Sequence, residues 1–360
     1  MPPQNGMPPL DARFFIGPQG WPYLLVPFIA IAIVLEVANA SAELVFFTSA
    51  LGIIPTAALM GRATEELASR SGPGIGGLMN VTFGNAPELI IALFAVDDGL
   101  VEVVRGSLTG SVVGNLLLVL GFSLVVGPTR ELDRRSALIS VGLVLAATFL
   151  FMIVAIPDWN GGTSPHTLEV LSLPVAIALL FVYIGVTAWQ LQRHRLLHAG
   201  ADADDSAWPL RVTLLTLGVA TAATAAIAEI LVGSIEVFAE SLHLSDFFVA
   251  AVIVAIVGNA AEHGGAVVVA HRGKVDLAAE IALASAAQVA VFLIPAVALL
   301  SWTIEPLALS FRQVEVAALG GSTVFATFVL WRGQSSRGRG LALVAAYAAV
   351  AAGFFVAGDR

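Results

Sequence analysis

The sequence predicts an all-α membrane protein with about eleven transmembrane helices, one extra helix at the N-terminus followed by two inverted-topology repeats of five helices. Of its 360 residues, 58% are hydrophobic and only 12% are charged, whereas a soluble domain carries about 25% charged residues. Apolar runs of about 20 residues, long enough to cross a bilayer as helices, follow one another along the chain. A motif of the first half recurs in the second half. The first two observations predict a protein that spans the membrane, and the third predicts that it contains two repeats.

The composition also excludes several classes of function. The chain contains no cysteine, so a disulfide framework, a thiolate metal site, a cysteine nucleophile and a redox CxxC motif are all impossible. The formal net charge is -9 at pH 7, whereas a protein that neutralises phosphates needs a basic surface. Nucleic acid is therefore not an expected partner.

Short connections separate the eleven expected helices. Residues 1–20 form a tail that lacks the basic flank of a signal peptide, so no cleaved leader is expected. Residues 21–40 hold the extra helix. The expected spans are 21–39, 43–61, 74–96, 106–127, 136–156, 168–190, 211–235, 247–270, 276–300, 312–331 and 340–357.

The basic residues predict the orientation of these helices. When loops are assigned alternately to the two sides of the membrane, 14 of the 17 lysines and arginines fall on one side, and only Arg105, Arg312 and Arg360 fall on the other. Cytoplasmic loops are enriched in lysine and arginine. The tail and the N-terminus are therefore expected in the cytoplasm, and the C-terminus on the opposite side.

A repeat with an offset of 174 residues organises the chain. The segment GNAPE at 84–88 recurs as GNAAE at 258–262, and the same offset places five expected spans of the first half on five of the second. The two five-helix repeats are 41–190 and 211–360, joined by a linker at 191–210. Because five is odd, the second repeat enters the membrane from the opposite side. Such inverted repeats are typical of secondary transporters, which bind substrate near the midplane.

The linker is acidic and is expected in the cytoplasm. It carries Asp202, Asp204 and Asp205. A regulatory calcium site is one interpretation of these carboxylates, and a solvated acidic loop is the simpler one.

Two glutamates are predicted deep in the membrane. Glu88 lies inside the third expected span and Glu262 inside the eighth, each within roughly 5 Å of the midplane at about 1.5 Å per residue. A charged side chain at this depth costs at least about 2.5 kcal/mol, so it needs a partner and usually marks an ion pathway. Two such residues at positions related by the repeat indicate a binding site.

The residues before each glutamate favour a cation held by oxygen atoms. Gly84 with Asn85, and Gly258 with Asn259, allow the backbone to unwind and expose carbonyl oxygens. Carboxylate, carboxamide and carbonyl oxygens suit a hard cation, calcium before magnesium. Protons compete with the cation for the same carboxylates. That competition is antiport in its simplest form.

The fourth and ninth spans carry a second group of polar residues. Ser111 and Asn115 lie four residues apart, and Ser285 and Gln288 three apart, so each pair shares a helix face. They are expected to complete the cation site or to hydrogen-bond the glutamates. Hydrogen bonding between closely packed helices is an equally good interpretation of the two serines.

At these residues the sequence resembles the calcium/proton exchangers, the CAX branch of the cation/calcium exchanger superfamily. The first repeat reads GGLMNVTFGNAPELIIALFAV and then GSLTGSVVGNLLLVLGFS, and the second reads VGNAAEHGGAVVVA and then VDLAAEIALASAAQVAVFLIP. With the ATEELA segment at 63–68, the resemblance covers almost all of the chain from Trp21 onward. Two positions depart from the family pattern. Pro87 resembles the sodium/calcium branch, and Ala284 replaces a glycine before Ser285.

The resemblance implies a secondary antiporter, not an enzyme, that exports cytosolic Ca²⁺ in exchange for H⁺ by alternating access. It implies that Glu88 and Glu262 bind both ions in turn and that the neighbouring Asn, Ser, Gln and Gly residues support the site. His263 keeps the proton-exchanger pattern and would orient Glu262 or assist proton transfer. No cofactor is implied, and Ca²⁺ is the transported substrate.

Other interpretations stay open at this point. The same fold could couple to Na⁺ or carry Mn²⁺, and a passive channel and an intramembrane enzyme are more remote. Near the cytoplasmic side, Glu65 and Glu66 follow Arg62 and could form an ion pair or a vestibule that attracts calcium. The expected partners are Ca²⁺, H⁺ and the lipid bilayer, and assembly of identical chains stays open. The composition and short loops fit a bacterial inner membrane.

Overall fold

The computed structural model describes residues 20–71, 76, 79, 82–197 and 208–359. These residues are helical, apart from connections and an isolated β-bridge between Glu131 and Gln334, so the predicted all-α class is confirmed. Turns η1 and η5 are 3₁₀-helical, and η2, η3 and η4 are π-helical. The elements are η1 (Trp21–Leu25), α2 (Pro27–Val37), α3 (Ala42–Arg70), α5 (Ala86–Asp97), α6 (Val101–Val113), η2 (Gly114–Val119), α7 (Leu120–Val126), α8 (Arg134–Trp159), α9 (Pro165–Leu197), α10 (Leu210–Gly233), α11 (Ile235–Ser241), α12 (Asp246–Phe248), η3 (Val249–Val254), α13 (Ala255–Gly258), α14 (Ala260–His271), α15 (Val275–Gln288), η4 (Val289–Leu293), α16 (Ile294–Leu300), η5 (Ser301–Thr303), α17 (Gln313–Leu330) and α18 (Arg337–Ala357).

The helices confirm a protein that crosses the membrane many times. Eight described helices are long and apolar enough to span a bilayer, and a ninth candidate is the pair Asp246–Gly258 and Ala260–His271, which is bent by 60°. Two shorter apolar elements coincide with other expected spans, Trp21–Val37 and α5. The part of the chain before α5 lies partly outside the described residues. The count of eleven spans stays a prediction.

Two helices run past their expected ends. Helix α3 continues to Arg70, where Arg62 and Glu66 form an ion pair of 3.3 Å on one helix face. Helix α9 continues to Leu197, so the beginning of the expected linker is helical. The three linker aspartates, Asp202, Asp204 and Asp205, lie outside the described residues, as does almost all of the expected N-terminal tail.

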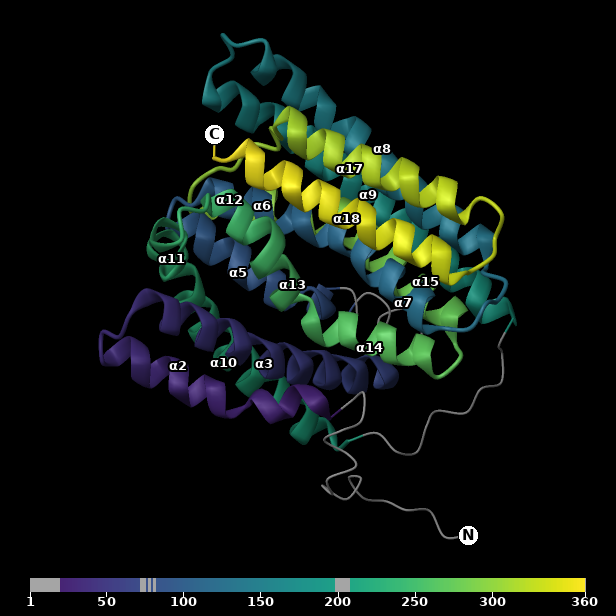
Figure 1. Ribbon diagram of the computed structural model, residues 1–360, viewed down its shortest axis with the longest axis horizontal. Helices are drawn as coiled ribbons and strands as arrows, with labels where there is room; N and C mark the ends of the chain where they lie inside the picture. The colour runs from purple at the N-terminus through teal and green to yellow at the C-terminus, as the bar shows by residue number, and fades with distance from the viewer. Residues whose placement is uncertain (1–19, 72–75, 77–78, 80–81, 198–207, 360) are drawn as a thin grey trace.

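The helices form three groups that lie side by side (Figure 1). Helices α2, α3 and α10 pack together on one flank, and α8, α9, α17 and α18 lie on the other. Between them run α5, α6 and α7 from the first repeat and α13 to α16 from the second. The segments that carry the predicted site residues therefore occupy the middle of the bundle.

The 174-residue offset of the sequence recurs in the local structure. Helix α5 begins at Ala86 and α14 at Ala260, and each has twelve residues. Positive backbone φ angles follow at Gly99 and Gly273, with values of 73° and 89°. The π-helical turns η2 and η4 occupy corresponding positions. Opposite orientation of the two repeats in a membrane stays a prediction.

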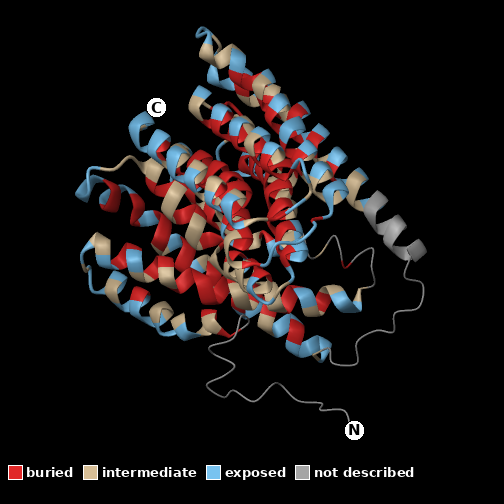
Figure 2. Ribbon diagram, turned by 45° about the vertical axis from the view of Figure 1, so that its right-hand side comes forward, coloured by how far each residue is buried: buried red, intermediate tan, exposed pale blue. Residues whose placement is uncertain are grey.

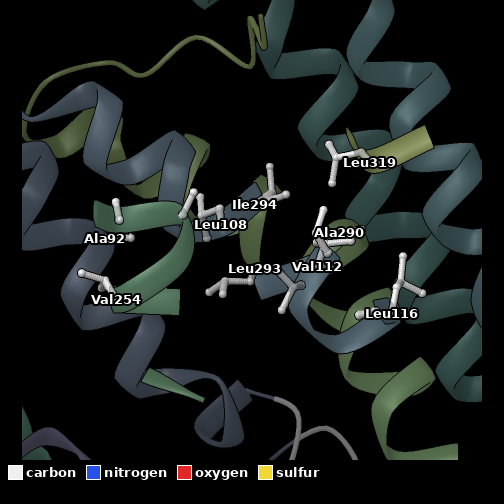
Figure 3. Packing of buried hydrophobic residues seen from close by; sticks show 14 of the residues in the cluster. Ala92, Leu108, Val112, Leu116, Val254, Ala290, Leu293, Ile294 and Leu319 are labelled. Carbon is white, nitrogen blue, oxygen red and sulfur yellow. The ribbon is translucent and has the colours of Figure 1, made fainter. Parts of the chain in front are cut away.

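The interior is apolar and the periphery is apolar as well. Buried residues concentrate between the helices (Figure 2), and Leu108, Val112, Leu293 and Ile294 lie in one cluster where α6 meets η4 and α16 (Figure 3). Large apolar side chains also cover the outside; Phe328 is 76% exposed. Lipid tails solvate such a surface as well as a protein core does. The polar site is thus enclosed on both sides by apolar packing.

Candidate functional site

The site is formed where two helices break. Asn85 and Asn259 precede α5 and α14 with nearly identical backbone angles, φ −96° and ψ 12° or 2°, outside the helical basin. Glu88 and Glu262 therefore lie in the first turns of the new helices, whose positive ends interact favourably with carboxylates. Pro87 lies within the first turn of α5, where an amide donor is not needed.

Both glutamates line one cavity of about 530 Å³. Glu262 is exposed to the cavity, whereas Oε2 of Glu88 is buried and has no hydrogen-bond partner among the described residues. The two carboxylates interact electrostatically and repel each other when both are ionised. A Cβ atom on Gly258 would lie 3.8 Å from Cγ of Glu88, so this glycine gives the glutamate its room. The other predicted residues on the cavity wall are Gly84, Asn85, Asn259 and Gln288.

Hydrogen bonds cross between the two repeats beside this cavity. Nδ2 of Asn259 donates to Oγ of Ser111 at 3.0 Å, and Nδ2 of Asn115 donates to Oγ of Ser285 at 3.1 Å. Each bond joins a residue of one repeat to a residue of the other. Ser285 in turn donates to Oε2 of Glu262 at 3.3 Å. The amides thus position the hydroxyl groups, and one hydroxyl group positions a glutamate.

Gln288 and Asn85 form a third bond across the repeats, from Nδ2 of Asn85 to Oε1 of Gln288 at 3.4 Å. By contrast, Ser111, Asn115 and Ser285 do not line the main cavity. Ser111 borders a void of about 10 Å³ beside Glu88. The predicted residues therefore divide into a cavity wall and a supporting layer behind it.

Several buried oxygen atoms at the site lack donors. Within the described residues, Oε2 of Glu88, Oδ1 of Asn115 and Oδ1 of Asn259 have no hydrogen-bond partner. An unsatisfied buried acceptor costs about 1–3 kcal/mol, and a cation or a proton would relieve that cost. In the described part of the chain, no group of three or more His, Asp or Glu side chains is arranged to hold a metal ion. A cation here would therefore be held by two carboxylates and otherwise neutral oxygens, a donor set that suits Ca²⁺.

His263 does not line the cavity of the two glutamates. Its ring lines a second, largely apolar cavity, and its Nε2 atom is buried without a hydrogen-bond partner in the described structure. Consecutive residues of a helix point in directions about 100° apart, so the neighbour of Glu262 faces another side of α14. Support of the cation site by His263 therefore stays a prediction.

The cavity reaches residues that the sequence motifs do not mark. It extends from the glutamates to Tyr23, to Arg62 and Glu65 of α3, and to Arg272 after α14. Of the two vestibule candidates, Glu65 thus lines the cavity, while Glu66 pairs with Arg62. The sequence could have indicated Arg272, because this residue follows the motif of the second repeat on the side of the membrane that receives most basic residues.

A second polar cluster lies near the start of α6 and was missed. Glu102 contacts Arg105 at 3.8 Å and Arg312 at 3.4 Å, and Arg312 contacts Glu315 at 3.7 Å. The guanidinium of Arg312 lies 4.0 Å from the centre of the Phe247 ring. The sequence analysis counts Arg105 and Arg312 among the few basic residues of one side of the membrane, but both side chains are largely buried, and that of Glu315 is fully buried. We refer to Glu102, Arg105, Arg312 and Glu315 as the ion-pair cluster.

Known proteins share this fold and much of this sequence. The Ca²⁺/H⁺ antiporter of Synechocystis sp. is 35% identical, covering 86% of this chain and 90% of its own length. The Ca²⁺/H⁺ antiporter ChaA of Bacillus subtilis is 37% identical, covering 84% and 90%. The structure of native YfkE superposes with a TM-score of 0.81 at 33% identity, over 93% of this chain and 99% of that one. The H⁺/Ca²⁺ exchanger CAX superposes with a TM-score of 0.67 at 14% identity and supports the fold alone.

These similarities confirm the resemblance drawn from the repeated motif. The relatives named above are transporters, not enzymes. The model of the family described as sodium/calcium exchanger protein matches residues 41–192 and 212–356, most of the chain. The protein therefore belongs to the sodium/calcium exchanger protein family.

Proposed function

We propose that the protein is an antiporter that exports cytosolic Ca²⁺ in exchange for H⁺, with Glu88 and Glu262 binding both ions in turn near the membrane midplane. The observation that carries the proposal is one cavity lined by both glutamates, one from each copy of the motif. The relatives named above, Ca²⁺/H⁺ antiporters from two bacteria, support it.

The chemistry of exchange follows from the charge of the two carboxylates. Two ionised carboxylates neutralise one Ca²⁺, and two protons neutralise them when the cation leaves. Either occupied state carries little net charge, whereas the empty, doubly ionised state has two like charges close together. The empty ionised site is therefore the state least able to reorient, so ion movement in one direction is coupled to movement in the other.

Asn85, Asn259 and Gln288 would add neutral oxygens to the cation shell from the cavity wall, together with the backbone at Gly84 and Gly258. Ser111, Asn115 and Ser285 would hold these groups from behind. His263 has no assigned contact with the ion in this proposal.

The asymmetry of the bundle supports alternating access. The cavity reaches Arg62 and Arg272, which lie on the side that carries 14 of the 17 basic residues. We assign that side to the cytoplasm. The described conformation is then inward-open, and the opposite side is closed near the ion-pair cluster. Eleven spans, inverted five-helix repeats and a cytoplasmic N-terminus complete the proposed topology, in a bacterial inner membrane.

Calcium flux in proteoliposomes tests the proposal. With an imposed pH gradient, the parent protein should move calcium, and Glu88→Gln and Glu262→Gln should each abolish the exchange because the variant cannot neutralise the cation or carry its proton. Glu229→Gln is a matched control, since Glu229 is exposed on α10 and does not line the cavity. Exchange that survives either site substitution contradicts the assignment of the site. Uptake driven by a sodium gradient instead would identify the sodium-coupled alternative.

A further inference from the structure

The largely apolar cavity that His263 lines is a groove between the two repeats. It has a volume of about 700 Å³, within the range of about 300–1,000 Å³ for small-molecule sites. One wall is η2 and α7, with Leu118 and Phe122, and the other is α13 and α14, with Ile256 and Val268. Phe122 is 43% exposed, so the groove opens at the outer surface of the bundle. Its apolar walls and opening suit a hydrocarbon chain supplied by the bilayer.

One end of the groove is basic. His271 and Arg272 line it there, both are exposed, and the exposed Lys274 follows. None of the three forms an ion pair with a residue in the described part of the chain. A cationic rim at the mouth of an apolar groove is complementary to a lipid with an anionic headgroup, and such basic pockets between transmembrane helices bind anionic lipids.

The first repeat lacks the residues that form this basic rim in the second. At the 174-residue offset, His271 and Arg272 correspond to Asp97 and Asp98, so the charge at this helix end is reversed. Gly264 corresponds to Ile90. The absence of a side chain at Gly264 lets the Trp21 indole lie against α14, since a Cβ there would approach Cζ2 of Trp21 to 2.7 Å.

Trp21 also lines the groove, where its ring lies against Gly264, seven residues before His271 and so roughly 10 Å along α14 from the basic rim. The ring therefore adds to the apolar wall of the groove, away from the rim. The apolar walls then extend from the rim toward the membrane interior.

We propose that the groove between α7 and α14 binds an anionic phospholipid, with its acyl chain along the apolar walls and its phosphate against His271 and Arg272. Arg272 lines both this groove and the ion cavity. A bound phosphate would thus neutralise a positive charge at the entrance used by Ca²⁺. The bound lipid would raise the apparent affinity for Ca²⁺, a consequence that rests on the proposed function, whereas lipid binding itself does not.

Native mass spectrometry of the detergent-solubilised full chain tests the binding. The parent should retain phosphatidylglycerol in preference to phosphatidylcholine. Arg272→Gln should lower that preference about fivefold, as expected for one basic residue at a lipid surface. Val268→Trp should fill the groove and weaken binding of both lipids. Arg332→Gln is the matched control, because Arg332 is exposed after α17 and does not line the groove.

Two results would overturn the proposal: an unchanged lipid preference in Arg272→Gln, or an equal loss in Arg332→Gln. A second measurement compares the calcium KM in proteoliposomes with and without phosphatidylglycerol. The lipid should lower KM for the parent and for Arg332→Gln by a larger factor than for Arg272→Gln. If the protein moved no calcium, the binding experiment would still decide the lipid site, so the two proposals fail separately.

Discussion

Two pairs of glutamates lie within the helices of this bundle, and they differ in their partners. Glu88 and Glu262 face a shared cavity, and neither forms an ion pair with an arginine in the described structure. Glu102 and Glu315 lie against Arg312 instead, at 3.4 and 3.7 Å. The first pair has no permanent counter-ion, whereas the second pair has one built into the chain.

This difference teaches what separates an ion site from a structural ion pair. A carboxylate away from water needs a positive partner. Where the protein supplies the positive partner, as for Glu102 and Glu315, the carboxylate is held in place and links α6 to α17. Where it does not, the partner has to come from solution and can leave again. Under the proposed function, glutamate therefore serves ion transport at Glu88 and Glu262 and closure of the bundle at Glu102 and Glu315.

The largest effect is expected when the permanent counter-ion is removed. Arg312→Met leaves Glu102 and the fully buried Glu315 without their shared arginine, and breaking a buried ion pair costs about 3–5 kcal/mol. Thermal unfolding of the purified protein in detergent should show a clear loss of stability. Arg332→Met, at an exposed arginine, should leave the midpoint unchanged. Equal midpoints for Arg312→Met and the parent would show that the ion-pair cluster does not stabilise this conformation.

The absence of cysteine allows the two regions to be probed by single thiols. Gly61→Cys lies on the cavity wall with no atom within 4 Å of a Cβ, and it should react with a membrane-impermeant thiol reagent applied from the Arg62 side. Ser107→Cys, at a position only 8% exposed, should stay unreactive from either side. Adding Arg312→Met should make Ser107→Cys reactive. Labelling of Ser107→Cys in the otherwise unchanged protein would break the distinction between an open and a closed side.

A smaller loss is expected along α6, which connects the two regions. A Cβ on Gly110 would overlap the carbonyl oxygen of Ala251 in η3. Gly110→Ala should therefore destabilise the protein by about 1–3 kcal/mol, the usual cost of overpacking. Gly61→Ala in α3 meets open space and should be neutral or stabilising by about 0.4–1 kcal/mol. Unfolding midpoints that rank the two variants in the opposite order would contradict the close contact of α6 and η3.

The smallest effect concerns the layer behind the glutamates. Ser285→Ala removes the hydroxyl that donates to Glu262; a hydrogen bond of about 1 kcal/mol corresponds to about fivefold in apparent calcium affinity. The calcium KM in proteoliposomes should rise by about that factor, and more at low pH, where protons compete better. Ser111→Ala, whose hydroxyl accepts from Asn259, should have a weaker pH dependence. A KM that does not respond to Ser285→Ala would place that hydroxyl outside the site.

The sequence predicts the fold class and the core of the site because these depend on local signals. Apolar runs predict helices in lipid, and Gly-Asn before Glu88 and Glu262 predicts the breaks that occur at Asn85 and Asn259. The repeat argues against coincidence, because Glu88 and Glu262 occupy equivalent positions in its two copies, 174 residues apart.

The rest depends on contacts between distant segments. Arg312 and Glu102 lie 210 residues apart. A count of the charges on each side of the membrane does not indicate which charged residues contact each other. The cavity that His263 lines depends on geometry as well, because proximity in sequence to Glu262 does not place both side chains on one helix face. The length of α3 was underestimated because the helix continues past its apolar run.

The hydrogen bonds that cross between the repeats also constrain how the two halves can diverge. Asn259 depends on Ser111, and Asn115 on Ser285, so the partner of each residue lies in the other copy of the motif. A substitution at one of these positions would therefore be compensated by a substitution of its hydrogen-bond partner in the other repeat, not of the equivalent residue 174 positions away. Among related chains, covariation should link the positions of Asn259 and Ser111 more strongly than those of Ser111 and Ser285. A substitution at these positions in one repeat alone would remove a hydrogen bond that holds it to the other repeat.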